Sequence, residues 1–276
     1  GICFEFAKKL YDAGCHVLIM DLRVRHDCQA WMDSLPKNGP TKVYFYKASV
    51  ADWKELEAVF DVYKREIGGT PYLVCPGAGV YEPSFNNFWN DKDKDGHYTL
   101  LDINLLAPIK MMRIAIRKML QADQPGIILH ISSIGAQKSS ITTPLYQCSK
   151  HGISSFTRAM APLQEWAGIR VVGVAPGVTL SPLFLDHPNA MKFLNRETDY
   201  VVMPEEIARG MMAVATEKEK YPPGTILEIA KEWRQVFLLN DPGPRGPGTF
   251  TSNRDSVGEE IKAMLRAERG SGSAKL

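Results

Sequence analysis

The sequence predicts an α/β fold, a doubly wound parallel sheet with helices on both of its faces. Short runs rich in β-branched and apolar residues alternate with longer stretches of helical periodicity. These runs are apolar almost throughout, which is typical of parallel strands that are buried on both faces. With 276 residues, of which 45% are hydrophobic and 23% charged, the chain can bury one large core.

The elements follow in chain order. "GICFEFAKKL" opens with a glycine turn, and Phe4, Ala7 and Leu10 then recur at helical spacing, which predicts an amphipathic helix. The expected strands are 16–21, 43–47, 72–75, 126–132, 169–175 and 225–229. The other expected helices are 53–67, 98–121, 145–167 and 204–216. This alternation of strands and helices predicts a Rossmann-type sheet.

The composition changes near residue 240. "NDPGPRGPG" cannot form a helix or a central strand, and "GSGSAKL" ends the chain as a flexible segment. We therefore expect one domain over residues 1–239 and a tail over 240–276, with a short helix around "GEEIKAMLRAERG".

Charge and cysteine content exclude several functional classes. A formal net charge of +2 without a dense Lys/Arg block predicts no nucleic acid partner and no anionic membrane surface. No apolar run approaches the ~18 residues of a membrane span. The five cysteines are widely spaced and form no C-x-x-C, which argues against a disulfide framework and indicates a reducing cytoplasmic location. Ala274, Lys275 and Leu276 resemble the S-K-L peroxisomal signal, so the peroxisome is the alternative.

The strongest local motif is "LYQCSKHG". Tyr146 and Lys150 are four residues apart on an expected helix, so their side chains share one face. A nearby ammonium favours the phenolate and lowers the pKa of a phenol from its usual ~10, so the pair can take and return a proton. Ser133 ends an expected strand thirteen residues before the tyrosine, and Asn104 lies on the preceding helix.

Together with "PGVTLS" (176–181), these residues resemble the short-chain dehydrogenase/reductase family over Gly1 to about residue 230. The resemblance implies that Tyr146 is the general acid/base, that Lys150 lowers its pKa and holds the nicotinamide ribose, and that Ser133 fixes the reacting oxygen. Asn104 is implied to hold a water relay behind the lysine. Within the family, "YQCSKHGISSFTRA" is similar to the hydroxyprostaglandin dehydrogenase branch and its fungal relatives.

The resemblance also implies a nicotinamide cofactor at the carboxyl ends of the strands. The corresponding positions are Gly1, Ile2, Asp21, Ser49, Val50, Gly77, Ala78, Gly79, Tyr146, Lys150, Pro176, Gly177, Val178 and Ser181. Asp21 ends its strand where a carboxylate binds the adenosine ribose and repels a 2′-phosphate, which favours NAD over NADP, although Arg23 could recruit a phosphate instead. A homodimer or homotetramer through the helices 98–121 and 145–167 is the family expectation.

The chain departs from the family pattern at four places. Of the motif T-G-x-x-x-G-I-G, only the last three positions are present, as Gly1, Ile2 and Cys3, with Cys3 in place of a glycine. The family's first strand, which lies between the strands that end at Asp21 and Cys75, is absent. We therefore expect an incomplete form that folds poorly or binds cofactor weakly. Ser49 replaces an Asp that contacts adenine, and Thr143 replaces a glutamine of the prostaglandin enzymes, which puts prostaglandin in doubt as the substrate.

The sequence predicts an NAD-dependent oxidoreductase that interconverts a hydrophobic secondary alcohol and its ketone. Residues 179–203 are the expected substrate lid, and their Leu, Phe and Met content indicates a hydrophobic substrate. The alternative is a catalytically impaired relative that acts as a binding or partner subunit. Residues 91–102 fit the spacing of a calcium loop, but Asp102 stands where a bidentate Glu is usual, so we interpret the segment as an acidic loop and expect no metal.

Overall fold

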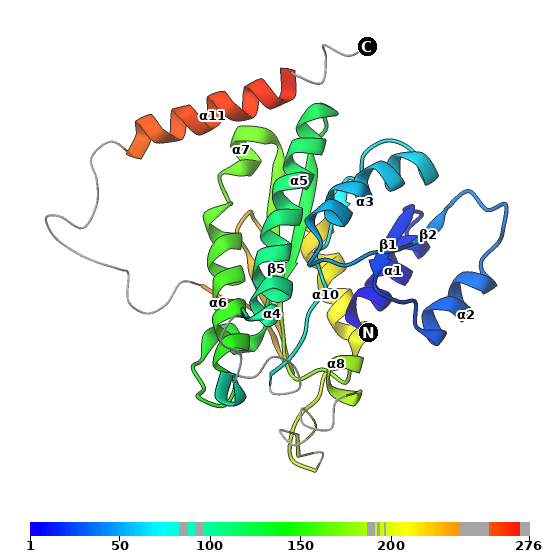
Figure 1. Ribbon diagram of the computed structural model, residues 1–276, viewed down its shortest axis with the longest axis vertical. Helices are drawn as coiled ribbons and strands as arrows, with labels where there is room; N and C mark the ends of the chain where they lie inside the picture. The colour runs from blue at the N-terminus through cyan, green and yellow to red at the C-terminus, as the bar shows by residue number, and fades with distance from the viewer. Residues whose placement is uncertain are drawn as a thin grey trace, which may run out of the picture.

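The computed structural model describes residues 1–82, 88–91, 96–186, 191, 194–195, 197–237 and 254–270 (Figure 1). All structural statements below refer to these residues. The fold is α/β, as predicted, with parallel strands flanked by helices.

The strands form two sheets. β1 (Val17–Asp21) pairs in parallel with β2 (Val43–Lys47). The second sheet has the order β3-β4-β5-β6-β7, with β3 (Leu73–Val74), β4 (Gly126–Ile131), β5 (Ile169–Pro176), β6 (Ile226–Ile229) and β7 (Trp233–Gln235). All pairings in it are parallel except β6 with β7. The six predicted strands are confirmed, and β7 was not expected from the sequence.

No backbone pairing joins β1 to β3 in the part of the chain that the structure describes. The two strands border a gap in the place where the family resemblance implied a further strand. Two helices bridge the gap, one on each face. α1 (Ile2–Asp12) packs against β1 and α10 (Pro204–Thr216), while α3 (Trp53–Glu66) packs against β2 and α5 (Ala107–Gln121).

Two hydrophobic cores lie on opposite faces of the larger sheet, as a doubly wound fold requires. Successive residues of β4 point to opposite faces, so Ile128 packs with α3 and α5, whereas Ile127 and Leu129 pack with α1 and α10. β5 is buried along its whole length and contributes to both cores. This explains why its sequence is apolar without alternation.

The remaining helices differ from the sequence expectation in detail. The helix predicted at 98–121 consists of α4 (Thr99–Leu101), a π-helix (Asp102–Leu106) and α5. The one predicted at 145–167 is divided into α6 (Pro144–Ala159) and α7 (Leu163–Ala167), and Pro162 lies at the division. The shorter elements are α2 (His26–Ser34), α8 (Pro182–Leu185) and 3-10 turns at Phe88–Asn90 and Ile134–Gln137. None of the described helices is long and apolar enough to cross a membrane.

The tail contains a longer helix than expected, α11 (Arg254–Gly270), which lies across the ends of α5 and α7 (Figure 1). Leu265 is buried in the core beneath it, Arg113 pairs with Glu268, and Arg269 donates to the Ala167 carbonyl at 3.0 Å. The tail is therefore docked on the domain through this helix.

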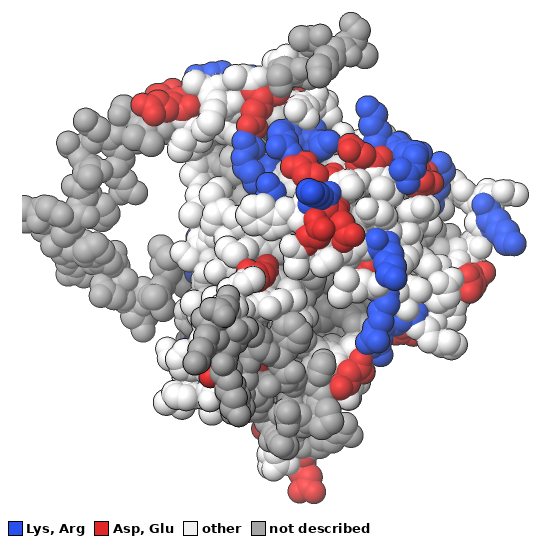
Figure 2. Space-filling model, in the orientation of Figure 1, with Lys and Arg blue, Asp and Glu red and all other residues white. Residues whose placement is uncertain are grey.

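Charges on the face shown in Figure 2 are mixed in sign. Basic and acidic side chains lie side by side over α3 and α5, where Arg117 pairs with Glu57 and Lys118 Nζ lies 3.1 Å from the Asp61 carboxylate. Each of these pairs joins one helix to the other. The charges on this face thus hold two helices together and do not form a patch of a single sign.

Candidate active site

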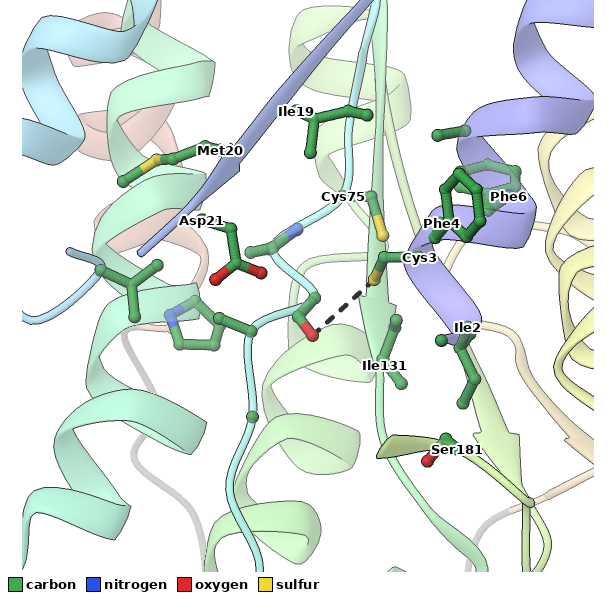
Figure 3. A pocket seen from close by; sticks show the side chains of 18 of the residues that line it. Ile2, Cys3, Phe4, Phe6, Ile19, Met20, Asp21, Cys75, Ile131 and Ser181 are labelled. Atoms are coloured by element: carbon green, nitrogen blue, oxygen red, sulfur yellow. Dashed lines mark hydrogen bonds between the residues drawn. The ribbon is translucent and has the colours of Figure 1, made fainter. Parts of the chain in front are cut away.

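A cavity of about 1110 Å³ lies between the two sheets and runs along β1 and β3, from their amino ends at residues 15–16 and 71–72 to their carboxyl ends. All the candidate cofactor residues line it, and so do Ser133, Tyr146 and Lys150. Figure 3 shows part of its wall, where Asp21 at the end of β1 faces the segment that follows β3, and Cys3 extends from α1. The fold therefore brings together at one opening side chains that are far apart in the sequence.

The helix that carries Tyr146 is fixed at its first turn by a buried carboxylate. α6 begins with Pro144, and Thr143 before it makes no side-chain cap. Instead, the Tyr146 backbone N–H donates to Glu82 Oε2 at 2.9 Å, and the Phe88 N–H donates to Glu82 Oε1 at 3.2 Å. Glu82 has no exposed surface. A carboxylate at a helix N-terminus satisfies a free N–H and complements the helix dipole. Sequence analysis missed Glu82 because it precedes the helix by more than sixty residues.

Burial dominates the chemistry of Tyr146. It raises the pKa of the phenol to about 12, a hydrogen bond with Ser133 acts in the opposite direction, and the neighbouring Tyr81 raises the pKa further. We expected Lys150 to lower the pKa of Tyr146, but in this structure burial raises it. The phenol is therefore protonated at neutral pH and held in contact with the Ser133 hydroxyl.

Lys150 lies against the face of the Tyr146 ring. Its Nζ is 5.6 Å from the ring centre and donates to the Ile131 carbonyl at 2.9 Å. Burial lowers the pKa of Lys150 to about 8, while the nearby Cys3 acts to raise it. The lysine is therefore still mostly protonated at neutral pH, and its charge is directed toward the end of β4.

Two serines at the end of β4 have different environments. Ser133 is buried, and its Oγ accepts the Gly135 N–H at 3.0 Å as the cap of a 3-10 turn. Ser132 Oγ donates to the Lys150 carbonyl at 3.1 Å and contacts Ser154 Oγ at 2.6 Å. Ser132 thus ties α6 to β4, and Ser133 is the one that acts on Tyr146.

Asn104 is buried in the π-helix and lies behind the cavity wall. Its side-chain amide binds the backbone of Val80 at both ends, because Oδ1 accepts the Val80 N–H at 2.9 Å and Nδ2 donates to the Val80 carbonyl at 2.8 Å. A π-helical turn inside a longer helix is often found at functional sites. Here it sets the position of the segment directly after Gly77, Ala78 and Gly79.

The candidate cofactor residues occupy both sides of the gap. On the β1 side, Asp21 is exposed and accepts the Leu22 N–H at 2.7 Å, and the Ser49 N–H pairs with Glu55. On the β5 side, the Gly177 N–H donates to the Ile229 carbonyl at 2.8 Å, and Ser181 begins α8.

The cavity fits an elongated ligand such as a dinucleotide. Its part at the carboxyl ends of the strands extends from the Asp21 carboxylate to Tyr146 and Lys150, and the rest follows the space between β1 and β3. Gly77 forms part of the wall where a side chain could not fit, since a Cβ there would lie 2.2 Å from Cys3 Sγ. The residues present therefore match a ligand with a ribose hydroxyl at one end and a reactive group at the other.

Aromatic rings cover the catalytic tyrosine candidate. The Tyr81 ring packs edge-on against Tyr146 with 4.7 Å between ring centres, and the Phe184 ring of α8 lies 5.2 Å from Tyr81. Next to Phe184, the expected lid is tied to the other sheet because Arg25 Nη1 lies 2.5 Å from Asp186 Oδ2. Several lid residues, 187–190, 192, 193 and 196, lie outside the described residues.

The calcium-like segment lies partly outside the described residues, since 92–95 are not among them. Two of its described acids have other partners. Tyr98 donates to Asp91 at 2.8 Å, and His97 Nε2 lies 2.6 Å from the Asp102 carboxylate. No cluster of three or more metal-ligating side chains occurs among the described residues.

Comparisons with known proteins agree with the geometry of the site. Residues 1–190 match the short chain dehydrogenase family. The chain is 31% identical over 189 residues to the 15-hydroxyprostaglandin dehydrogenase [NAD(+)] of Rattus norvegicus, which covers 66% of each chain. It is 26% identical to the 3alpha-hydroxysteroid dehydrogenase of Mediterraneibacter gnavus, over 83% of this chain and 91% of the relative.

A fungal relative is also similar. The short chain dehydrogenase/reductase dpchG of Colletotrichum higginsianum is 27% identical, over 63% of this chain and 65% of the relative. With more than half of the chain matched by the family, and with its relatives acting as dehydrogenases, the chain is an oxidoreductase that belongs to the short-chain dehydrogenase/reductase family.

Proposed function

We propose that the chain is an NAD-dependent oxidoreductase that interconverts a hydrophobic secondary alcohol and its ketone. The observation that carries the proposal is the group at the cavity wall, where the half-buried Tyr146 lies beside Ser133, which acts on its pKa, and Lys150 lies against the tyrosine ring. NAD, when bound, supplies the site that accepts or returns a hydride.

The protein's part in the reaction is to move one proton and to hold one oxygen. Tyr146 is protonated at neutral pH, the form that donates a proton to a ketone oxygen during reduction. In oxidation, the phenolate form of the same side chain takes the proton of the alcohol. Ser133 Oγ, next to the phenol, orients the reacting oxygen, and the Lys150 ammonium favours the negative charge that develops on the phenol.

The surroundings of the tyrosine support a hydrophobic substrate. Tyr81 and Phe184 place apolar surface beside Tyr146, and the relatives named for hydroxysteroid and hydroxyprostaglandin act on molecules of this kind. The Asp21 carboxylate supports NAD over NADP because it would repel a 2′-phosphate. Arg23 and Arg25 follow it closely and could instead bind the 2′-phosphate of NADP. The experiment below therefore compares NADH with NADPH.

The first experiment is a fluorescence titration with NADH and NADPH, followed by an assay with a panel of steroid and long-chain secondary alcohols. We expect NADH to bind more tightly than NADPH, and Tyr146→Phe to abolish turnover while NADH binding is kept. Tyr11→Phe, on α1 outside the cavity, is the matched control and should behave as wild type. Turnover by Tyr146→Phe at the wild-type rate would overturn the proposal.

The gap between β1 and β3 favours a second candidate, a catalytically impaired relative that binds a ligand or partner subunit. Without backbone pairing between these strands, the two ends of the cofactor cavity are joined mainly through α1 and α3. If the wild-type chain binds neither NADH nor NADPH, this second candidate replaces the first.

We propose that the chain assembles as a homodimer or homotetramer through α5 and α6. α11 covers part of this surface at the ends of α5 and α7, so the contact would involve the part of α5 that α11 leaves open. We propose the cytoplasm as the location of the chain. Ala274, Lys275 and Leu276 support a peroxisomal location as the alternative, and they lie outside the described residues.

A further inference from the structure

Two cysteines that are far apart in the sequence meet at the wall of the cavity. Cys3 lies in the first turn of α1, and Cys75 directly follows β3. Figure 3 shows the two sulfur atoms facing each other, and each thiol shifts the pKa of the other. Cys3 Sγ also lies 3.7 Å from the Gly77 carbonyl oxygen. The pair therefore occupies the junction between α1 and the segment 75–79.

The contact is specific to these two cysteines. All five cysteines are free thiols, and among the described residues Cys3 and Cys75 are the two whose thiols shift each other's pKa. Cys3 is exposed where it lines the cavity, so a small solute can reach its sulfur. Gly77 leaves just enough room for this sulfur, because any side chain there would collide with it.

The environment gives the two thiols different roles. The interaction with Cys75 lowers the pKa of Cys3, with burial and Asp21 acting in the opposite direction, whereas the same interaction and burial raise the pKa of Cys75. The thiolate is the reactive form of cysteine, and a neighbouring thiol can then resolve the oxidised sulfur. Cys3 is thus the attacking thiol, and Cys75 holds a proton beside it.

We propose that Cys3 and Cys75 form a modification site, an oxidisable dithiol that hydrogen peroxide converts to a disulfide. The Cys3 thiolate attacks the peroxide oxygen, which breaks the O–O bond, forms a sulfenic acid on Cys3 and releases hydroxide that takes up a proton to become water. The Cys75 sulfur then attacks the Cys3 sulfur, its proton leaves with the hydroxyl group as water, and the S–S bond forms. Two thiols are oxidised and one peroxide is reduced to two waters.

The disulfide would fasten the start of α1 to the end of β3, at the positions that the proposed function assigns to cofactor binding. Gly1 and Ile2 directly precede Cys3, and Gly77 contacts its sulfur. Pulling the Cys3 sulfur toward Cys75 changes this wall of the cavity, so oxidation should weaken NADH binding. This consequence rests on the proposed function, whereas formation of the disulfide does not.

The test is peptide mass mapping of the full chain after treatment with hydrogen peroxide, under non-reducing conditions. We expect a linked peptide that contains Cys3 and Cys75, lighter by two hydrogen atoms than the two free peptides and lost on reduction. In Cys75→Ser we expect Cys3 to proceed to sulfinic acid. Cys15→Ser, an exposed cysteine outside the pair, should still form the link. Absence of the link in wild type, or links that join other cysteines instead, would overturn the proposal.

NADH titration of the oxidised and reduced wild type gives a second readout. The dissociation constant should rise about tenfold, equivalent to ~1.4 kcal/mol, and should recover on reduction. A linked peptide with unchanged NADH affinity refutes the regulatory effect and leaves the modification site standing. Failure of the reduced protein to bind NADH refutes the proposed function and does not affect the result of the mass mapping.

Discussion

His130 should make the stability of the protein depend on pH. The imidazole lies on β4 with no exposed surface, and its Nε2 is 3.4 Å from Met112 Sδ. Its Nδ1 has no hydrogen-bond partner among the described residues. Burial, and to a lesser degree the charge of Lys150, lower its pKa from 6.5 to about 4. The folded state therefore holds this side chain neutral over a range in which the unfolded chain binds a proton.

The sign and size of the effect follow from this difference in pKa. Between the two values the unfolded state binds more protons, so the free energy of unfolding rises with pH and falls as pH drops from 6.5 toward 4. At about 1.4 kcal/mol for each pKa unit, the full effect is about 3 kcal/mol, and roughly 2 kcal/mol of it is already lost at about pH 5.

Urea denaturation at about pH 7.5 and about pH 5 measures this loss. His130→Phe keeps the site apolar beside Met112 and removes the titrating group, so the variant should lose about 2 kcal/mol less than wild type between the two pH values. His26→Asn, an exposed histidine on α2, is the control and should lose as much as wild type. Equal pH sensitivity in wild type and His130→Phe would refute the reasoning.

Three further predictions concern the candidate site and the tail. Glu82→Ala leaves the part-buried Tyr146 and Phe88 N–H groups without their acceptor and should lower the free energy of unfolding by about 1–3 kcal/mol, whereas Glu82→Gln keeps one acceptor and should cost less. Urea denaturation compares the two variants, and equal costs would argue against the cap. Asp21→Ser should narrow the difference between NADH and NADPH affinity in fluorescence titrations, and an unchanged ratio would remove Asp21 from cofactor selection. Leu265→Ala should destabilise the protein by about 2–5 kcal/mol in thermal unfolding, because Leu265 is buried against the domain. An unchanged melting temperature would mean that α11 does not stabilise the domain in solution.

The sequence predicted the strands better than the helices. β5, "IRVVGVAP", is apolar apart from Arg170 because both of its faces are covered, and such runs are visible without any structure. β7 has only three residues and depends on pairing with β6, so no local pattern indicates it. α2 has one buried residue, Cys28, and therefore lacks the apolar periodicity by which a helix is recognised.

The candidate site was predictable where its residues belong to one local motif. Tyr146 and Lys150 share a helix, so their spacing alone places them together. Glu82 and the pair of Cys3 with Cys75 depend on contacts between segments that are distant in the chain, which spacing cannot reveal. The sequence analysis also expected a lowered pKa for Tyr146, whereas burial raises it. The degree of burial is a property of the folded chain and cannot be taken from the spacing of residues.

The division of the strands into two sheets has a mechanical consequence. A ligand that contacts both Asp21 and Lys150 is attached to both sheets at once, since Asp21 ends β1 and Lys150 is anchored to Ile131 on β4. Such a ligand links the two sheets, which share no backbone pairing among the described residues. Its binding free energy stabilises the contact between the two sheets, so occupancy should slow the exchange of backbone amides along β1 and β3 and raise the melting temperature.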